Sequence, residues 1–373
     1  MEKRFEYTTL AYRYTAKFPF LTYVGIQANF WIVANILLAA IVALQSKFIG
    51  QVFGVSVSAR LGPTLLIAII LGILYGVTLG VTGYYLDRKV FIKLSLGKVI
   101  LFKALGSLAF LILLLWLIKF ALSDISVWRL IYATTAKFNE RSIRYLFYLL
   151  VIYYFLMTLV ISFINQVNKK YGPGVLLPLL FGRYRNPREE ERIFMFMDLK
   201  SSTTIAEKLG HLKYSSFIRD CFMDINEVLM PFRAQVYQYV GDEIVVTWPE
   251  SEGLKNQFCI NFYFACKNQF IAKTEYYLKN YDLLPEFKAG IHGGRVTAVE
   301  IGEVKRDIAY HGDTLNTAAR IRSVCNEYHK DFLASEYIFT KVKPDQSIKT
   351  EPLGMIQLKG KMAKVGIVSL ESI

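Results

Sequence analysis

Four long apolar runs in the first half of the chain restrict its fold more than any other feature. Residues 18–46, 61–86 and 145–168 contain no Asp, Glu, Lys or Arg, and residues 99–122 carry only two lysines, near their ends. About 20 helical residues are needed to cross the roughly 30 Å hydrocarbon core of a bilayer. We therefore predict a membrane domain over residues 1–168 with four transmembrane helices, at about 24–46, 63–86, 99–122 and 145–167.

The charges divide the chain into two halves of different character. Residues 1–180 contain 18 Lys and Arg but 5 Asp and Glu, whereas residues 181–373 contain 26 and 25. A basic excess confined to the apolar half is typical of loops that face anionic lipid, so we expect a lipid bilayer as a partner and no nucleic acid. The second half holds four cysteines without a CxxC pair, which favours buried thiols over disulfides or zinc ligands. They are Cys221, Cys259, Cys266 and Cys325.

Basic residues next to the spans predict the orientation of the membrane domain. The N-terminal segment, the loop at 86–98 and the exit of the fourth span each carry four, although the 124–144 loop carries four as well. The positive-inside rule then places both termini in the cytoplasm of a multi-pass inner-membrane protein. No acidic residue lies within a predicted span, which disfavours a transporter.

Glycines in the second span repeat at a short spacing. Gly72, Gly76, Gly80 and Gly83 would let another helix approach closely, either within one subunit or across a dimer. After the fourth span, the Gly172-Pro173-Gly174 helix breaker begins a predicted coupling linker over 169–191.

From residue 192 the pattern changes to short apolar runs that alternate with amphipathic segments, which predicts one α+β domain over 192–373. Phe194–Met197 is expected to be a central strand covered on both faces. Gly241-Asp242 joins two strand-like runs and predicts a hairpin. Two further strands are expected, at Glu286–His292 and Val296–Gly302.

Two aspartates, Asp198 and Asp242, each follow an apolar strand. If the hairpin lies beside the first strand, both carboxylates emerge at one edge of the sheet. Ser201 to Thr204 open the next helix with an expected N-cap, and free N–H groups there favour phosphate. Paired carboxylates beside such a helix start fit a two-metal phosphoryl or nucleotidyl transfer site. As ordinary structure, the same residues would be an N-cap and a turn.

Four motifs together resemble the class III nucleotidyl cyclases. They are FMFMDLKSST at 194–203, YQYVGDEIV at 237–245, GIHGGRV at 290–296 and HGDTLNTAARI at 311–321. In the last, Asn316 and Arg320 stand at i and i+4 on one helical face, and Arg suits the charge that spreads over a phosphoryl group. The resemblance implies a catalytic domain with a ferredoxin-like βαββαβ core that is active as a head-to-tail homodimer.

The resemblance also implies roles for individual residues. Asp198, Asp242 and the backbone carbonyl of Leu199 would hold two Mg²⁺ or Mn²⁺ ions per site. Asn316 and Arg320 of the other subunit would be catalytic, orienting the ribose and stabilising the phosphoryl charge. Lys359 would bind the triphosphate, with Lys361 as a competitor. The expected substrate-binding residues at the helix start are Ser201, Ser202 and Thr203.

The base-reading positions differ from the family pattern. They are Gln238 and Ala309, whereas adenylate-specific members use Lys with Asp or Thr and guanylate-specific members use Glu with Cys. The Gln amide both donates and accepts, so it suits adenine or guanine, and Ala309 forms no side-chain hydrogen bond. The absence of a Glu for the guanine N–H groups favours ATP.

We therefore predict a membrane-bound adenylate cyclase that forms 3′,5′-cyclic AMP and pyrophosphate. The alternatives are a guanylate cyclase and a catalytically silent, cyclase-like membrane receptor or scaffold. A diguanylate cyclase shares the Gly-Asp-Glu stretch at 241–243, but the NxxxR helix argues against it.

Overall fold

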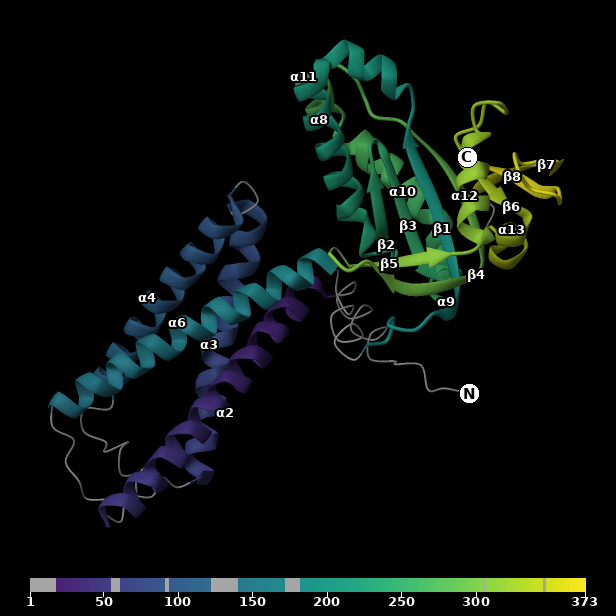
Figure 1. The fold of residues 1–373 in the computed structure, drawn as a ribbon. Helices are drawn as coiled ribbons and strands as arrows, with labels where there is room; N and C mark the ends of the chain where they lie inside the picture. The colour runs from purple at the N-terminus through teal and green to yellow at the C-terminus, as the bar shows by residue number, and fades with distance from the viewer. Residues whose placement is uncertain are drawn as a thin grey trace. The chain divides into compact units, whose positions relative to one another are not determined.

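The computed structural model describes residues 18–54, 61–90, 94–121, 140–171, 182–304, 306–344 and 347–373. The chain divides into two compact units, one of Lys17–Pro173 and one that contains Gly174–Ile373 (Figure 1). Residues 172–181 of the predicted linker lie outside the described residues. The same holds for the basic N-terminal residues 1–17 and for 122–139.

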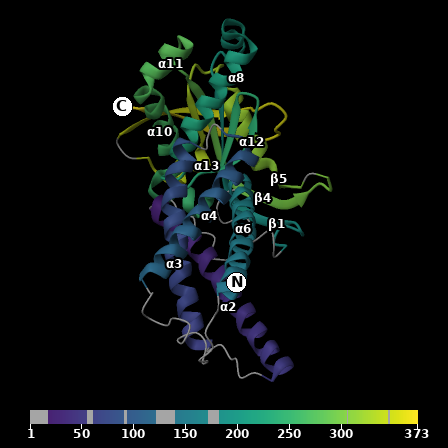
Figure 2. The same cartoon turned by 90° about the vertical axis from the view of Figure 1, so that its left-hand side faces the viewer.

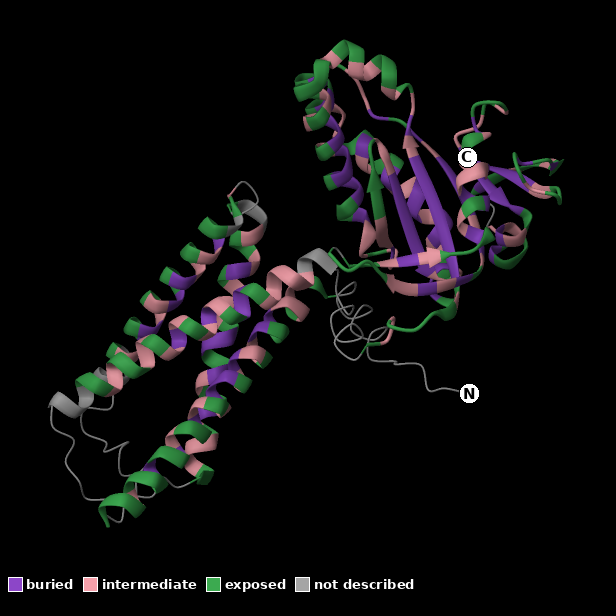
Figure 3. Cartoon of the chain, viewed as in Figure 1, coloured by how far each residue is buried: buried purple, intermediate pink, exposed green. Residues whose placement is uncertain are grey.

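The described residues of the first unit form four helices: α2 (Pro19–Phe53), α3 (Leu61–Lys89), α4 (Leu96–Ala121) and α6 (Glu140–Tyr171). Each is long enough and apolar enough to cross a membrane by length and composition. Many of their apolar side chains stay exposed, which is typical of a surface that faces lipid (Figure 3). The fold prediction of four apolar helices before an α+β domain is confirmed.

Glycines bring α3 into close contact with α2. A Cβ atom at Gly72 would lie 2.6 Å from the Ile32 Cα, and one at Gly76 would lie 2.5 Å from the Ala28 Cα. Only glycine fits at such a distance. Of the two interpretations of the glycine spacing, packing within one chain is the one found.

Polar groups inside the four-helix unit pair with one another. The Tyr154 hydroxyl donates to Asn35 Oδ1 at 2.7 Å, and the Tyr75 hydroxyl lies 2.7 Å from Ser107 Oγ. Helix α3 reaches Asp87, just beyond the predicted span, where the carboxylate forms a 2.9 Å ion pair with Lys103 of α4. These buried groups are thus satisfied within the bundle, as an apolar environment requires.

The second unit is built on an eight-stranded sheet with the order β2-β3-β1-β4-β6-β8-β7, in which β5 also pairs with β4. The strands are β1 (Arg188–Leu199), β2 (Gln235–Val240), β3 (Glu243–Pro249), β4 (Phe287–Ile301), β5 (Asp307–His311), β6 (Phe332–Ser335), β7 (Ile348–Ile356) and β8 (Val365–Ser372). The longer helices are α8 (Ser202–Leu229), α10 (Phe258–Ala272) and α12 (Asp313–Ser323). The shorter ones are α9 (Glu250–Gly253), a 3₁₀ turn at Lys255–Gln257, α11 (Thr274–Tyr281) and α13 (Glu336–Val342).

The first part of this unit has the predicted ferredoxin-like core. Along the chain β1, α8, β2, β3, α10 and β4 follow one another, and their strands lie in the order β4-β1-β3-β2. Strand β1 pairs antiparallel with both β3 and β4, so it is the central strand of this core (Figure 1). Helix α8 packs against α10 (Figure 2).

Side chains of β1 pack on both faces of the sheet. Ile193, Met195 and Met197 belong to the large core that includes α8 and α10. Phe194 and Phe196 belong to a smaller cluster on the opposite face, together with Ala318 of α12. The prediction of a strand covered on both faces is confirmed, and the face of Phe194 and Phe196 is here called the α12 face.

Strand β4 differs from the sequence prediction of two separate strands. It runs unbroken from Phe287 to Ile301, and its ladder with β1 continues through Gly293 and Gly294. A Cβ at Gly293 would lie 2.8 Å from Ile338 Cδ1 of α13, so this glycine permits close packing and forms no turn.

Candidate functional site

The two aspartates predicted to bind metal lie at one edge of the sheet. Asp198 is near the end of β1 and stands directly opposite Glu243, the first residue of β3. Asp242 precedes Glu243 in the β2–β3 turn, where Gly241 adopts a positive φ of 62°. Both Asp198 and Asp242 are partly exposed. The hairpin therefore lies beside β1, as the sequence argument required.

An arginine that the sequence analysis did not single out joins these carboxylates. Arg322 Nη1 lies 3.0 Å from Asp198 Oδ2, and Arg322 Nη2 lies 2.5 Å from Glu243 Oε2. The pairs are partly buried, with 28% of the Arg322 side chain exposed. Arg322 stands two residues after Arg320, and Glu243 directly follows Asp242. Glu243 lies inside the motif at 237–245 and Arg322 directly follows the motif at 311–321, and these positions were the available signals.

Partial burial changes the acidity of the carboxylates. It raises the pKa of Asp198, an effect that Arg322 opposes and the Asp242 carboxylate reinforces. The pKa of Glu243 is raised in the same way, by burial first, against the effect of Arg322. Each carboxylate is therefore easier to protonate than a solvated one. A cation beside them favours the charged form.

A close approach of α12 to β4 fixes the position of Arg322. A Cβ at Gly290 would lie 2.2 Å from the Arg322 backbone nitrogen and 2.8 Å from the Ala318 carbonyl oxygen. Gly290 pairs with Phe196 of β1, two residues before Asp198. The glycine thus lets the helix backbone rest on the sheet beside the carboxylates.

Asn316 and Arg320 lie on a different part of α12 from Arg322. Two residues correspond to about 200° around a helix, so Arg320 projects nearly opposite to Arg322, which contacts Asp198. Asn316 is exposed. The structure therefore does not bring the predicted catalytic pair together with the predicted metal ligands of the same chain.

The β7–β8 loop lies beside Arg320. A Cβ at Gly360 would lie 3.3 Å from Arg320 Nη2. Lys361 Nζ is bound within the chain, at 2.7 Å from Asp313 Oδ2 and 2.7 Å from Thr317 Oγ1. Lys359 is exposed. Arg320 thus lies beside the loop that carries Lys359, and it points away from the carboxylates.

The hydroxyl residues after β1 begin helix α8 as predicted, but the expected side-chain cap is wrong. Ser201 occupies the N-cap position with φ 53° and makes no side-chain capping bond. In this left-handed conformation its side chain does not reach the helix N–H groups. Ser201 and Thr203 are exposed and Ser202 is partly buried. In the sequence, these three residues closely follow Asp198.

A bulge in β2 positions the predicted base-reading residue Gln238. Val236 pairs with Val246 and Gln238 with Val245, so Tyr237 is the extra residue. Val245 faces α12, and therefore Gln238 does so as well. The Tyr237 ring lies 5.2 Å from that of Tyr310, the neighbour of the buried Ala309. The structure brings the strands of Gln238 and Ala309 together.

The four cysteines are free and buried, as predicted.

His292 is partly buried in the domain, with Nδ1 2.7 Å from Ser335 Oγ. His292 thus has a packing and hydrogen-bonding role. His311 is exposed.

We predict that His292 makes the stability of the protein depend on pH. Burial, reinforced by Lys361, lowers its pKa from 6.5 to about 4. Below about pH 6.5 the His292 imidazole binds a proton in the unfolded chain but not in the folded chain. The free energy of unfolding therefore falls as the pH drops from about 6.5 to about 4. Denaturant unfolding should show a loss of about 2 kcal/mol between pH 7 and pH 5 that is absent in His292→Gln. Equal pH slopes in both proteins would contradict this assignment.

The residues at the sheet edge suit a hard divalent cation. Carboxylate and carbonyl oxygens are what Mg²⁺ and Mn²⁺ prefer, and Asp198, Asp242 and Leu199 supply them. The Arg322 guanidinium beside Asp198 shows that a positive charge is accommodated there. Among the described residues, no group of three or more His, Cys, Asp or Glu side chains is gathered closely enough to form a metal site unaided. Carbonyl and substrate oxygens would have to complete the coordination.

Comparisons with known proteins place this arrangement in context. Residues 185–370 match the family model for the adenylate and guanylate cyclase catalytic domain. Adenylate cyclase 2 of Rhizobium meliloti (strain 1021) is 35% identical over 210 residues, which are 56% of this chain and 58% of that protein. Adenylate cyclase 1 of the same strain is 25% identical over 183 residues, 48% of this chain and 27% of that protein. The chain thus spans less than two thirds of the length of either relative.

A solved structure has a similar fold. A bacterial light-regulated adenylyl cyclase aligns with a TM-score of 0.50 over 59% of this chain and 64% of that chain. The sequence identity is 18%, so this likeness concerns the fold alone.

Proposed function

Residues 185–370 belong to the family of adenylate and guanylate cyclase catalytic domains, and we propose that the chain is a membrane-bound adenylate cyclase. It would convert ATP to 3′,5′-cyclic AMP and pyrophosphate. The observation that carries the proposal is the division of the motif residues into two groups. Asp198 and Asp242 lie at the sheet edge, whereas Asn316 and Arg320 project from another side of α12.

Two such groups on one chain support a homodimer with shared sites. Each protomer would supply its carboxylates to one site and Asn316, Arg320 and Lys359 to the other. In a head-to-tail dimer, two copies complete two equivalent sites by the same contact. A single chain leaves Arg320 turned away from its own Asp198.

The reaction requires little covalent chemistry from the protein. The ribose 3′-oxygen attacks the α-phosphorus, the bond to the bridging oxygen breaks, pyrophosphate leaves, and the 3′-hydroxyl proton passes to solvent. Two divalent cations held by Asp198, Asp242 and the Leu199 carbonyl would acidify the hydroxyl and neutralise the triphosphate. Asn316 would orient the ribose by hydrogen bonds, and Arg320 would stabilise the charge that develops on the phosphoryl oxygens.

Two parts of the chain are suited to the triphosphate. Lys359 is the better candidate for its binding, because Lys361 Nζ is already engaged by Asp313 and Thr317. The start of α8 would add free N–H groups and the hydroxyls of Ser201, Ser202 and Thr203. These groups lie just beyond Asp198 in the chain.

Gln238 is the proposed reader of the base. Its amide can accept from the adenine amino group and donate to a ring nitrogen, while Ala309 leaves space without a hydrogen bond. No acidic side chain stands at either position to accept from the guanine N–H groups. ATP is therefore the proposed substrate.

The four apolar helices indicate a membrane protein. We place the catalytic domain in the cytoplasm and the chain in the inner membrane, because basic residues gather in the flanks on that side of the predicted spans. This location would also give the domain access to ATP and divalent cations.

The proposal predicts a nucleotide preference that product analysis can test. Full-length protein in detergent should form cyclic AMP from ATP with Mg²⁺ or Mn²⁺, at least about tenfold faster than cyclic GMP from GTP, the discrimination that one hydrogen-bonded base contact provides. Cyclic GMP as the main product would reassign the substrate. No product from either nucleotide would favour the silent receptor or scaffold.

A further inference from the structure

Arg322 contacts the predicted metal site but lies outside the cyclase motifs. Its two terminal nitrogens contact Asp198 Oδ2 at 3.0 Å and Glu243 Oε2 at 2.5 Å. Asp198 Oδ2 thus already interacts with a cation from the same chain. A divalent cation bound at this oxygen would have to compete with the guanidinium.

The strand pairing favours a positive charge at this position. Asp198 and Glu243 stand directly opposite each other on β1 and β3, and their side chains lie on the same face of the sheet. Like charges in such a pair repel, and both side chains are largely shielded from solvent, with 27% and 14% exposed. Arg322 neutralises part of this repulsion, as would a metal ion.

The contacts of the guanidinium are incomplete. Arg322 Nε is buried and has no hydrogen-bond partner within the described part of the chain. The backbone of Arg322 is held firmly against Gly290, but its long side chain can rotate away without moving α12. Loss of two partly exposed ion pairs is a modest cost that a bound divalent cation can offset.

We propose that Arg322 is a built-in counter-cation of the metal site, which a divalent cation must displace from Asp198 before it binds. The side chain keeps Asp198 and Glu243 neutralised and lowers the apparent affinity for metal. The inference rests on the proposed function in that it takes Asp198 as a metal ligand. Because α12 also carries Asn316 and Arg320, displacement of Arg322 removes a contact of the helix that would serve the partner's site.

The experiment is a titration of the full-length protein with Mn²⁺ alone, without nucleotide, in which electron paramagnetic resonance measures the free ion. Arg322→Gln should bind Mn²⁺ about tenfold more tightly than wild type, since no cation has to be displaced. Arg322→Lys, which keeps the charge but cannot bridge two carboxylates in a fork, should fall between them.

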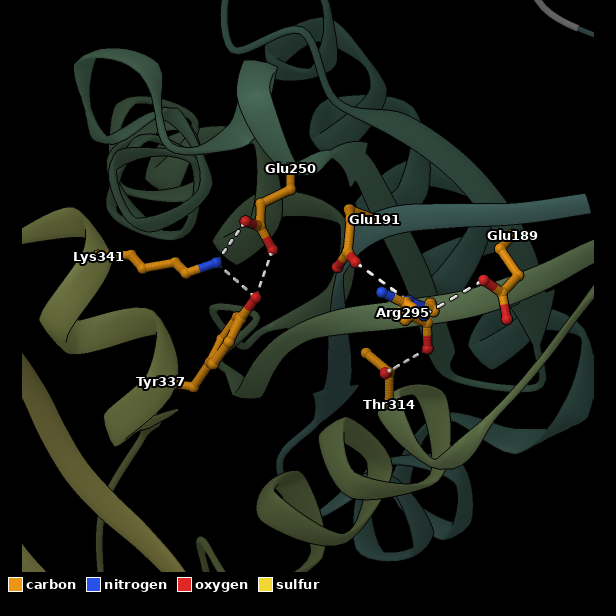
Figure 4. A network of polar contacts seen from close by, with 7 residues as sticks. All are labelled: Glu189, Glu191, Glu250, Arg295, Thr314, Tyr337 and Lys341. Carbon is orange, nitrogen blue, oxygen red and sulfur yellow. Dashed lines mark hydrogen bonds and ion pairs between the residues drawn. The ribbon is translucent and has the colours of Figure 1, made fainter. Parts of the chain in front are cut away.

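Arg295 provides the matched control. It also bridges two carboxylates of β1, with Nη1 3.3 Å from Glu189 and Nε 3.4 Å from Glu191, at the end of the strand remote from Asp198 (Figure 4). Arg295→Gln should leave the Mn²⁺ affinity unchanged.

Thermal unfolding gives a second readout. Relative to each protein in chelator, Mn²⁺ should raise the Tm of Arg322→Gln more than the Tm of wild type.

Unchanged or weaker Mn²⁺ binding by a folded Arg322→Gln would overturn the inference, and weaker binding would mean that Arg322 helps to build the site. A wild-type protein that makes no cyclic nucleotide, together with tighter binding by the variant, would reject the proposed function alone. Turnover by wild type with equal Mn²⁺ affinities would reject the role of Arg322 alone.

Discussion

Asp242→Asn should reduce the rate of cyclic AMP formation at least about 10³-fold, while the protein stays folded. The substitution preserves shape but removes the negative charge with which the carboxylate would hold a divalent cation and, through it, the triphosphate. A loss of this size corresponds to roughly 4 kcal/mol of transition-state stabilisation. Asp198→Asn should behave in the same way. Product formation at saturating Mn²⁺ and ATP measures both effects, and unchanged thermal unfolding excludes a folding defect.

Co-expression of two complementary variants tests whether each site is shared between subunits. In a shared-site dimer, a chain with Asp242→Asn still offers Asn316 and Arg320, and a chain with Arg320→Ala still offers its carboxylates. Mixed dimers would contain one complete site, so activity should return although each variant alone is inactive. Failure of the mixture, with mixed dimers shown by affinity tags, would reject sites shared between subunits.

Gly290→Ala should destabilise the catalytic domain by about 3 kcal/mol or more. The new Cβ would lie 2.2 Å from the Arg322 backbone nitrogen, 2.6 Å from its Cα and 2.8 Å from the Ala318 carbonyl oxygen. Backbone atoms cannot rotate away as a flexible side chain can, so α12 must lift from the sheet or β4 must shift. Denaturant unfolding measures the loss. Activity should fall with it, because α12 carries Asn316 and Arg320.

Gly354→Ala is the comparison for this substitution. Gly354 has a positive φ of 84°, but nothing lies within 4 Å of the position of its Cβ. Its replacement should therefore cost only about 1 kcal/mol of backbone strain. Similar losses for both variants would mean that the contact between α12 and β4 at Gly290 is less tight than the structure shows.

The order of elements and the two halves of the chain could be predicted from local patterns. Uncharged runs of transmembrane length predict spanning helices regardless of the rest of the protein, because a bilayer tolerates few alternatives. The continuous apolar run Phe194–Met197 similarly predicts a strand covered on both faces, and the Gly241-Asp242 turn predicts a hairpin. The position of that hairpin beside β1 comes from the strand pairing. The unbroken β4 could not be predicted, because a pair of glycines signals a turn until one knows that Ile338 packs above Gly293.

For the candidate site, residue types and spacing alone indicate which side chains are chemically suited: the carboxylates of Asp198 and Asp242, and the Asn316–Arg320 pair on one helical face. How these side chains are divided between two groups follows from the packing of α12 on the sheet. The approach of α12 to Gly290 turns Arg322 toward Asp198 and Arg320 away from it, and β3 sets Glu243 opposite Asp198. Such distances depend on packing between segments more than 100 residues apart in sequence, as Asp198 and Arg322 are. No local pattern of residues contains that information, because it arises only when the helix and the sheet are packed together.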